Sequence, residues 1–388
     1  MYVLTKTFYL FTGFHSFLLG LLPIFIPVIL WDKGLNISDI SYFIALTAIG
    51  FLVALYYWDW LRAQHHWAKL ISFSFIFQSL FVAILLLDNL SVLTTLGALI
   101  NGAAGCFYWS TQRLFFQAIT EDNNTGNTFG NFQIFVAFAL KVGVLLGSYL
   151  LGMEYFIALL ATSFGVSLIG FISVNKIFEN ALQPHSLPQV PAISLKQVVQ
   201  FVDSFRSKLI FMADGLFLFL ESYFWVLTIY MLTKENVMQL GLIIIMLSVA
   251  LALIFFVMKR YIDRINTFTV YRVAVIGYVS SWLLRGALNE ELTGVWLYAG
   301  LLLIAFLSNF FRLAFNKRFY DIARQDQPTR YIICKSYYSQ FMLAIFFSSI
   351  ALLTATTDTA IHQLQIVYYW CAPIALIYFV YGNKPSSQ

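Results

Sequence analysis

The stretch from Phe8 to Trp31 reads FYLFTGFHSFLLGLLPIFIPVILW and contains no Asp, Glu, Lys or Arg. A helix needs about 20 consecutive apolar residues to cross the hydrocarbon core of a bilayer. The stretch therefore predicts a membrane-spanning helix. No small-residue cleavage site follows it, so we expect it to stay in the chain and not to be removed as a signal peptide.

Eleven further segments are apolar over a comparable length: 40–58, 69–87, 91–114, 128–151, 155–174, 207–232, 238–258, 268–287, 293–314, 331–355 and 362–382. Hydrophobic residues make up 60% of the chain and charged residues only 11%, against about 25% charged residues in a typical soluble domain. This composition predicts an all-α integral membrane protein with twelve transmembrane helices, whose main partner is the lipid bilayer.

The basic residues indicate how the helices are oriented. Most of the Lys and Arg residues fall in or beside one set of connectors, while only Lys33, Lys234 and Arg285 fall in or beside the other set. Connectors rich in cations stay on the cytoplasmic side, so we expect both termini to be cytoplasmic. With a composition typical of bacteria, this predicts a multi-pass protein of the bacterial inner (plasma) membrane. Because the net charge of +5 is spread over helix ends, it does not indicate nucleic-acid binding.

The longest connector divides the chain into two halves. It spans residues 175–206 and contains Pro184, Pro188 and Pro191, which favour an extended linker. Its later part, Ile193 to Phe205, is compatible with a short amphipathic helix on the membrane. We expect a six-helix bundle at 1–174, a cytoplasmic linker at 175–206 and a second six-helix bundle at 207–388. Charge placement relates the two bundles by pseudo-symmetry, because Asp59 and Asp263 take corresponding positions.

Several classes of protein are not indicated. Cys106, Cys334 and Cys371 lie in apolar segments without metal-ligand spacing, so we expect no metal site or disulfide. No nucleotide-binding glycine loop, Gly-x-Ser-x-Gly or His-Glu-x-x-His is present. We therefore predict no cofactor and no enzymatic activity, and we expect a monomer.

Two loop motifs carry a resemblance to a known family. The first reads Trp58-Asp59-Trp60-Leu61-Arg62 and the second Lys259-Arg260-Tyr261-Ile262-Asp263-Arg264. Together with the six-plus-six plan, they resemble the loop motif of the major facilitator superfamily, although the family's glycine is absent from both. The resemblance implies a cytoplasmic gate formed by Asp59, Arg62, Asp263 and Arg264. The alternative is that both motifs are ordinary polar loops at helix ends.

The segment from Gly143 to Ser148, Gly-Val-Leu-Leu-Gly-Ser, is similar to a glycine motif of the superfamily's proton-antiporting drug exporters. It lacks the proline of that motif, and serine replaces its last glycine. The alternative interpretation is close packing of helices through small residues.

Ionisable groups at membrane depth are rare and usually face a partner or a hydrated cavity. Glu221, Asp214 and His15 are the candidates for proton coupling. The resemblance implies that Lys141 could approach Glu221 between the halves. A contact that changes during transport would then change the proton affinity of Glu221. The alternative is a permanent ion pair that only holds the halves together.

Polar and aromatic residues in the same spans predict a substrate-binding surface, because several follow helical spacing and share a face. The substrate-binding candidates are Lys141, Asn101, Tyr108, Gln112, Trp225, Asn309 and Arg312. The cations among them indicate a substrate with an anionic group. For Arg312 the alternative is a side chain that reaches to lipid headgroups, and for the aromatic residues it is packing.

We therefore expect a secondary transporter that works by alternating access, coupled to protons, with export of an anionic metabolite or siderophore favoured. A drug or cation efflux antiporter and a proton-coupled importer remain alternatives. A membrane-embedded enzyme fits the short external loops less well. A transporter-like receptor is a less favoured alternative that measured uptake or efflux would distinguish.

Overall fold

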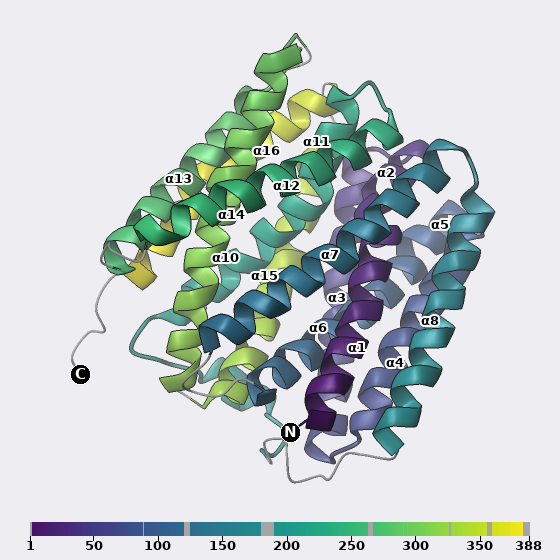
Figure 1. Ribbon diagram of the computed structural model, residues 1–388, viewed down its shortest axis with the longest axis vertical. Helices are drawn as coiled ribbons and strands as arrows, with labels where there is room; N and C mark the ends of the chain where they lie inside the picture. Colours follow the sequence, from purple (N-terminus) through teal and green to yellow (C-terminus); the bar gives the residue numbers. More distant parts are fainter. Residues whose placement is uncertain are drawn as a thin grey trace.

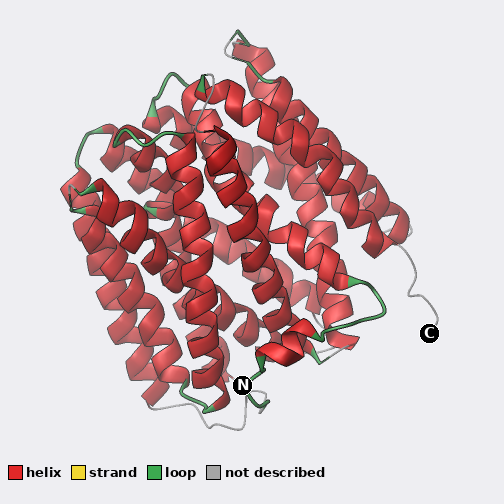
Figure 2. Cartoon of the chain, turned by 180° about the vertical axis from the view of Figure 1, so that it is seen from behind, coloured by secondary structure: helices red, strands yellow, loops and turns green. Residues whose placement is uncertain are grey.

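A computed structural model gives the structure at residues 2–87, 89–119, 125–179, 190–262, 267–289, 291–292, 294–325, 327–354 and 359–382. Throughout these ranges the regular structure is helical, and no strand occurs in them. The long helices run side by side as a bundle (Figures 1 and 2). The prediction of an all-α membrane protein is confirmed.

The first half begins with a span that is broken in its middle. Helix α1 (Tyr2–Leu21) is followed by the 3-10 turn η1 (Pro23–Phe25) and by α2 (Ile26–Asp32). The break falls at Pro23 because proline has no backbone N–H and cannot continue the hydrogen-bond pattern of a helix. The next helices are α3 (Ile37–Ala63), α4 (Trp67–Leu85), α5 (Leu90–Val92) with η2 (Leu93–Gly97) and α6 (Ala98–Ile119), α7 (Thr125–Gly152) and α8 (Phe156–Glu179).

The second half follows the short linker helix α9 (Leu195–Val199). Its first span contains α10 (Ser207–Phe219), the π-helical turn η4 (Leu220–Phe224) and α11 (Trp225–Leu232). The remaining elements are α12 (Val237–Ile262), α13 (Thr267–Ala287), α14 (Gly294–Gln325), α15 (Pro328–Thr354), and α16 (Ala360–Ala375) with the 3-10 segment η5 (Leu376–Gly382).

Every apolar segment of the sequence corresponds to one of these spans. Within the described ranges, eleven helical spans are long and apolar enough to cross a membrane. Helix α13 is not among them, although it has 21 residues and packs against α14 and α16. It carries Arg272 and Arg285, and Arg285 belongs to the buried charges described below.

Glycines allow helix α7 to approach α1 closely. A Cβ atom at Gly143 would lie 2.2 Å from the backbone oxygen of Phe17, and one at Gly147 would lie 2.2 Å from that of Leu21. No larger residue fits at either position. Close packing through small residues therefore accounts for the Gly143–Ser148 motif.

Contacts between the halves occur at both ends of the bundle. At the end opposite the first residues of α1, Tyr230 donates a hydrogen bond of 2.9 Å to Asp32, and Trp31 donates one of 3.1 Å to Glu235. Helices α3 and α15 pack against each other, and Ser38 donates a hydrogen bond of 2.7 Å to the backbone of Ala351. At the end where α1 begins, the rings of Phe116 and Tyr320 are 5.7 Å apart.

The described part of the linker contacts both halves. Helix α9 has only five residues, so a helix running from 193 to 205 is wrong. Ser194 caps α9 through a reciprocal capping box with Gln197. The buried ring of Phe201 packs against Phe211 and Tyr331 of the second half. Packing on the protein therefore positions this segment.

Candidate functional site

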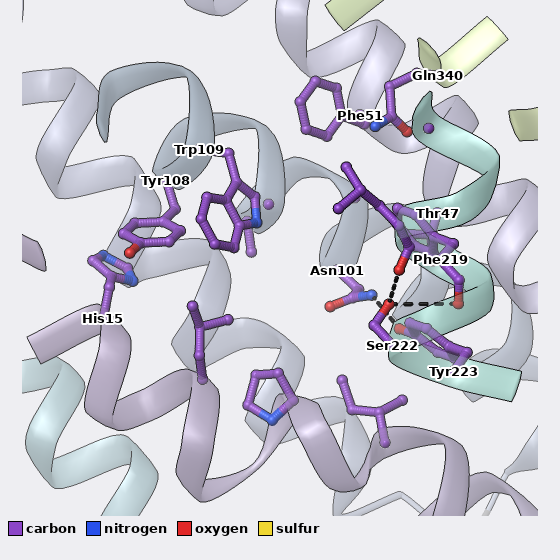
Figure 3. A pocket seen from close by; sticks show the side chains of 18 of the residues that line it. His15, Thr47, Phe51, Asn101, Tyr108, Trp109, Phe219, Ser222, Tyr223 and Gln340 are labelled. Carbon is purple, nitrogen blue, oxygen red and sulfur yellow. Dashed lines mark hydrogen bonds between the residues drawn. The ribbon is translucent and has the colours of Figure 1, made fainter. Parts of the chain in front are cut away.

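A cavity of about 370 Å³ lies between the two halves. Its walls come from α1, η1, α2, α3, α4, α6 and α7 of the first half and from α10, η4 and α15 of the second. Most of the lining is apolar or aromatic, including Phe51, Trp109 and Phe219 (Figure 3). The charged residues in the lining are Arg113 and Lys335, apart from the titratable His15; no carboxylate of the described residues lines it. A mostly apolar cavity with a few polar groups is the usual form of a small-molecule site.

His15 is fixed in the wall of this cavity by stacking. Its ring centroid is 4.3 Å from that of Phe75 and 4.4 Å from that of Tyr108, and His15 and Tyr108 face each other in Figure 3. Its Nε2 atom is 2.9 Å from the Ser74 hydroxyl, and the residue is 4% exposed. No described carboxylate pairs with it.

The predicted stripe on α6 lies partly in the cavity. Asn101 and Tyr108 line it, whereas Gln112 does not. The Asn101 amide donates a hydrogen bond of 3.2 Å to the hydroxyl of Tyr223 on η4, so this bond connects the two halves across the cavity. Arg113 also lines the cavity and forms no ion pair with any residue that the structure describes.

The other predicted substrate residues lie outside the lining. Trp225 is buried beneath Arg285, whose guanidinium carbon is 4.9 Å from the Trp225 ring centroid. Asn309 is exposed and donates to the Ala305 carbonyl of its own helix. Lys141 is partly buried and has no ion-pair partner in the described part of the chain.

Arg312 of α14 binds both predicted coupling carboxylates. Its Nη1 atom is 2.7 Å from Asp214 Oδ1, and its Nη2 atom is 3.3 Å from Glu221 Oε2. The hydroxyl of Tyr278 also donates to Glu221 Oε1 at 2.9 Å. Glu221 therefore pairs within its own half, and the expected approach of Lys141 to Glu221 is wrong. Arg312 faces these carboxylates, which excludes lipid headgroups as its partner in this structure.

Two further cations complete this buried charge network of Asp214, Glu221, Arg285, Arg312 and Lys335. Lys335 Nζ is 2.7 Å from Asp214 Oδ2, and Arg285 Nη2 is 3.8 Å from Glu221 Oε1. Three cations thus face two carboxylates, so with every group charged the network carries an excess of one positive charge. Lys335 also lines the cavity, and it is the member of the network that reaches the cavity.

Lys335 and Arg285 were missed as site residues in the sequence analysis. Both fall inside apolar segments, at 331–355 and 268–287, but close to the ends of these segments, where a cation usually indicates topology. Their positions inside predicted spans were the available signal. Arg285 is 1% exposed and also donates hydrogen bonds to Ser281 and Ser308.

The predicted gate on α3 contacts the linker. Arg62 Nε is 2.7 Å from Asp59 Oδ1, and the guanidinium also donates to the backbone oxygens of Val190 and Pro191. Asp59 Oδ2 accepts a hydrogen bond of 2.7 Å from the backbone N–H of Ile193. Tyr338 of the second half donates to the α9 backbone. Asp263 and Arg264 lie outside the described residues.

Comparison with known proteins gives the fold. No family model matches the chain, and no curated sequence matches it. Two crystal structures of the nucleoside transporter NupG, one of them of a mutant, match 97% of this chain and 98% of theirs, with TM-scores of 0.66 and 0.64 and 13% sequence identity.

The fold is that of a multi-pass membrane protein built from long apolar helices. More narrowly, the chain has the fold of the major facilitator superfamily. This confirms the fold predicted from the loop motifs and the six-plus-six plan.

Proposed function

We propose that this protein is a secondary transporter that carries a small organic anion by alternating access, together with a proton. The observation that carries the proposal is the charge of the cavity: its lining contains Arg113 and Lys335 and no described carboxylate. A cation in a low-dielectric wall attracts an anionic group far more strongly than it would in water. A cationic drug would meet charges of its own sign in this lining, which disfavours the efflux alternative.

The contact between Lys335 and Asp214 supports proton coupling. An anion that enters beside Lys335 competes with Asp214 for the ammonium group. A buried carboxylate that loses one of its cations binds a proton more readily. Binding of the anion therefore promotes protonation of Asp214. The anion and the proton then cross the membrane in the same direction.

This coupling favours uptake under an inward proton gradient over the export expected from the sequence. The export hypothesis depended on the Gly143–Ser148 motif and on the acidic residue at membrane depth. Close packing on α1 accounts for the glycines of the motif, and the proposed role of Asp214 couples an acidic residue to uptake instead. The rest of the proposal keeps the sequence-based expectations: a monomer in the bacterial inner membrane with cytoplasmic termini, in which a cytoplasmic linker at 175–206 joins the six-helix bundles at 1–174 and 207–388.

A neutral nucleoside is the second candidate substrate. It is the cargo named for the two structural neighbours, and the aromatic rings and side-chain amides of the cavity favour it. The charge of the preferred ligand distinguishes the two candidates.

The test is thermal unfolding of the purified protein with three compounds that share one ring: 4-methylbenzoate, 4-methylbenzamide and 4-methylbenzylammonium, with uridine added for the second candidate. A ligand that binds only the folded state raises its apparent stability. We expect the largest shift with the carboxylate, and a smaller shift in Arg113→Gln. An equal or larger shift with the amide, the ammonium compound or uridine, or no shift with the carboxylate, contradicts the anion proposal.

A further inference from the structure

Two glutamines differ from most of the other uncharged polar residues of the cavity. Gln78 of α4 and Gln340 of α15 both line it, and they are 7% and 9% exposed. Gln78 Nε2 and Gln340 Oε1 are completely buried and have no hydrogen-bond partner among the described residues. Figure 3 shows Gln340 beside Phe51 at the edge of the cavity.

Most of the neighbouring amide and hydroxyl groups are satisfied within the protein, although the Thr47 hydroxyl is also buried without a partner among the described residues. Asn101 donates to the Tyr223 hydroxyl, Ser222 to the Leu218 carbonyl and Ser339 to the Phe211 carbonyl. Folding has therefore provided partners for these groups but not for the amides of Gln78 and Gln340. Buried side-chain amides are nearly always hydrogen-bonded in native proteins, so two exceptions in one cavity need an explanation.

We propose that Gln78 and Gln340 form a neutral subsite, which binds an uncharged hydrogen-bonding group of the substrate apart from its anionic group. Each side-chain amide offers both a donor and an acceptor. Its natural partner is a group that also has both, such as a carboxamide, a cyclic imide or a hydroxyl. The inference rests on the proposed function and narrows the substrate to a ring-bearing carboxylate that carries such a second group.

The two glutamines belong to different halves, since α4 precedes the linker and α15 follows it. A ligand whose neutral group contacts both amides connects the halves through the cavity. Such bonds are complete only when the halves are close together around the ligand. The subsite therefore also provides a means by which the correct substrate favours the closed state of the transporter.

This arrangement predicts strong discrimination against compounds that lack the neutral group. A site built to hydrogen-bond a ligand rejects an analogue without the bonding group, because the polar groups of the site then stay unpaired. Simple aromatic carboxylates should bind weakly, through Arg113 and Lys335 alone. Loss of the amides should remove the preference without removing the binding of the carboxylate.

The experiment compares the affinities of 4-carbamoylbenzoate and 4-methylbenzoate by calorimetry, in the wild type and in Gln78→Leu and Gln340→Leu. Leucine is apolar and close to glutamine in size, and no described hydrogen bond within the protein is lost. The matched control is Gln112→Leu, which changes an amide of α6 that does not line the cavity. We expect the wild type and the control to prefer 4-carbamoylbenzoate by about tenfold or more.

In Gln78→Leu and in Gln340→Leu we expect the affinity for 4-carbamoylbenzoate to fall to about that for 4-methylbenzoate. The affinity for 4-methylbenzoate should stay unchanged. If the wild type binds both carboxylates equally, or if the variants keep the preference, the neutral subsite is wrong while the anion proposal stands. If neither carboxylate binds, the anion proposal fails, and terephthalamide tests the subsite separately. Binding of this diamide that is lost in the leucine variants supports the subsite, and absence of binding overturns it as well.

Discussion

The two halves hold their polar groups at membrane depth in different ways. In the first half His15 lies between two aromatic rings, with a single hydrogen-bonding contact to a serine. In the second half Asp214, Glu221 and three cations form a continuous network. The one ion pair described in the first half, Asp59–Arg62, lies at the end of α3. Two bundles of similar plan therefore have different electrostatic interiors, and the second contains the groups to which we assign proton exchange in the proposed function.

The largest effect should come from removing the central cation of that network. Arg312→Met leaves the Asp214 and Glu221 carboxylates with fewer partners, and breaking a buried ion pair from one side costs about 3–5 kcal/mol. We expect a loss of this size in the free energy of unfolding in detergent. Lys141→Met is the control, because Lys141 has no ion-pair partner among the described residues, and should change stability by about 0.5 kcal/mol or less. Equal losses in the two variants would contradict the structural role of the network.

An intermediate effect is expected where α3 contacts the linker. Arg62→Met removes the ion pair with Asp59 and the hydrogen bonds to Val190 and Pro191, at a cost of about 1–3 kcal/mol. Trypsin should then cut faster after Lys196, which is exposed on α9. The control is Lys69→Met, an exposed position at the start of α4. An unchanged cleavage rate would show that Arg62 does not hold the linker.

The smallest effect should be at His15. His15→Phe keeps the stacking between Phe75 and Tyr108 and loses the contact with Ser74, which is worth about 1 kcal/mol. Thermal unfolding should change little, and proton movement coupled to transport should persist. Loss of that coupling with folding intact would return His15 to the role that the sequence suggested and would weaken the contrast between the halves.

The membrane-spanning helices could be predicted because insertion into a bilayer depends on the number of consecutive apolar residues, which can be counted in the sequence. The side chains that bind Arg312 could not be predicted from the sequence. Helical spacing places Arg312 on one face with Asn309 and Ser308, but only packing decides whether that face meets the cavity, lipid or α10. The roles of Lys335 and Arg285 could not be predicted either. Their charges lie near helix ends, where a cation that sets topology and one that pairs inside the bundle look the same.

Substrate-driven proton movement in proteoliposomes tests the central claim most directly. Vesicles loaded with a pH-sensitive dye receive the carboxylate that gives the largest thermal shift, and the signal of protein-free vesicles is subtracted. The account predicts that uptake by the wild type acidifies the lumen. It also predicts that Asp214→Asn, which keeps Lys335 as an anion-binding cation, exchanges the carboxylate without moving protons. Uptake by the wild type without a pH change, alkalinisation of the lumen, or continued proton movement in Asp214→Asn would contradict it.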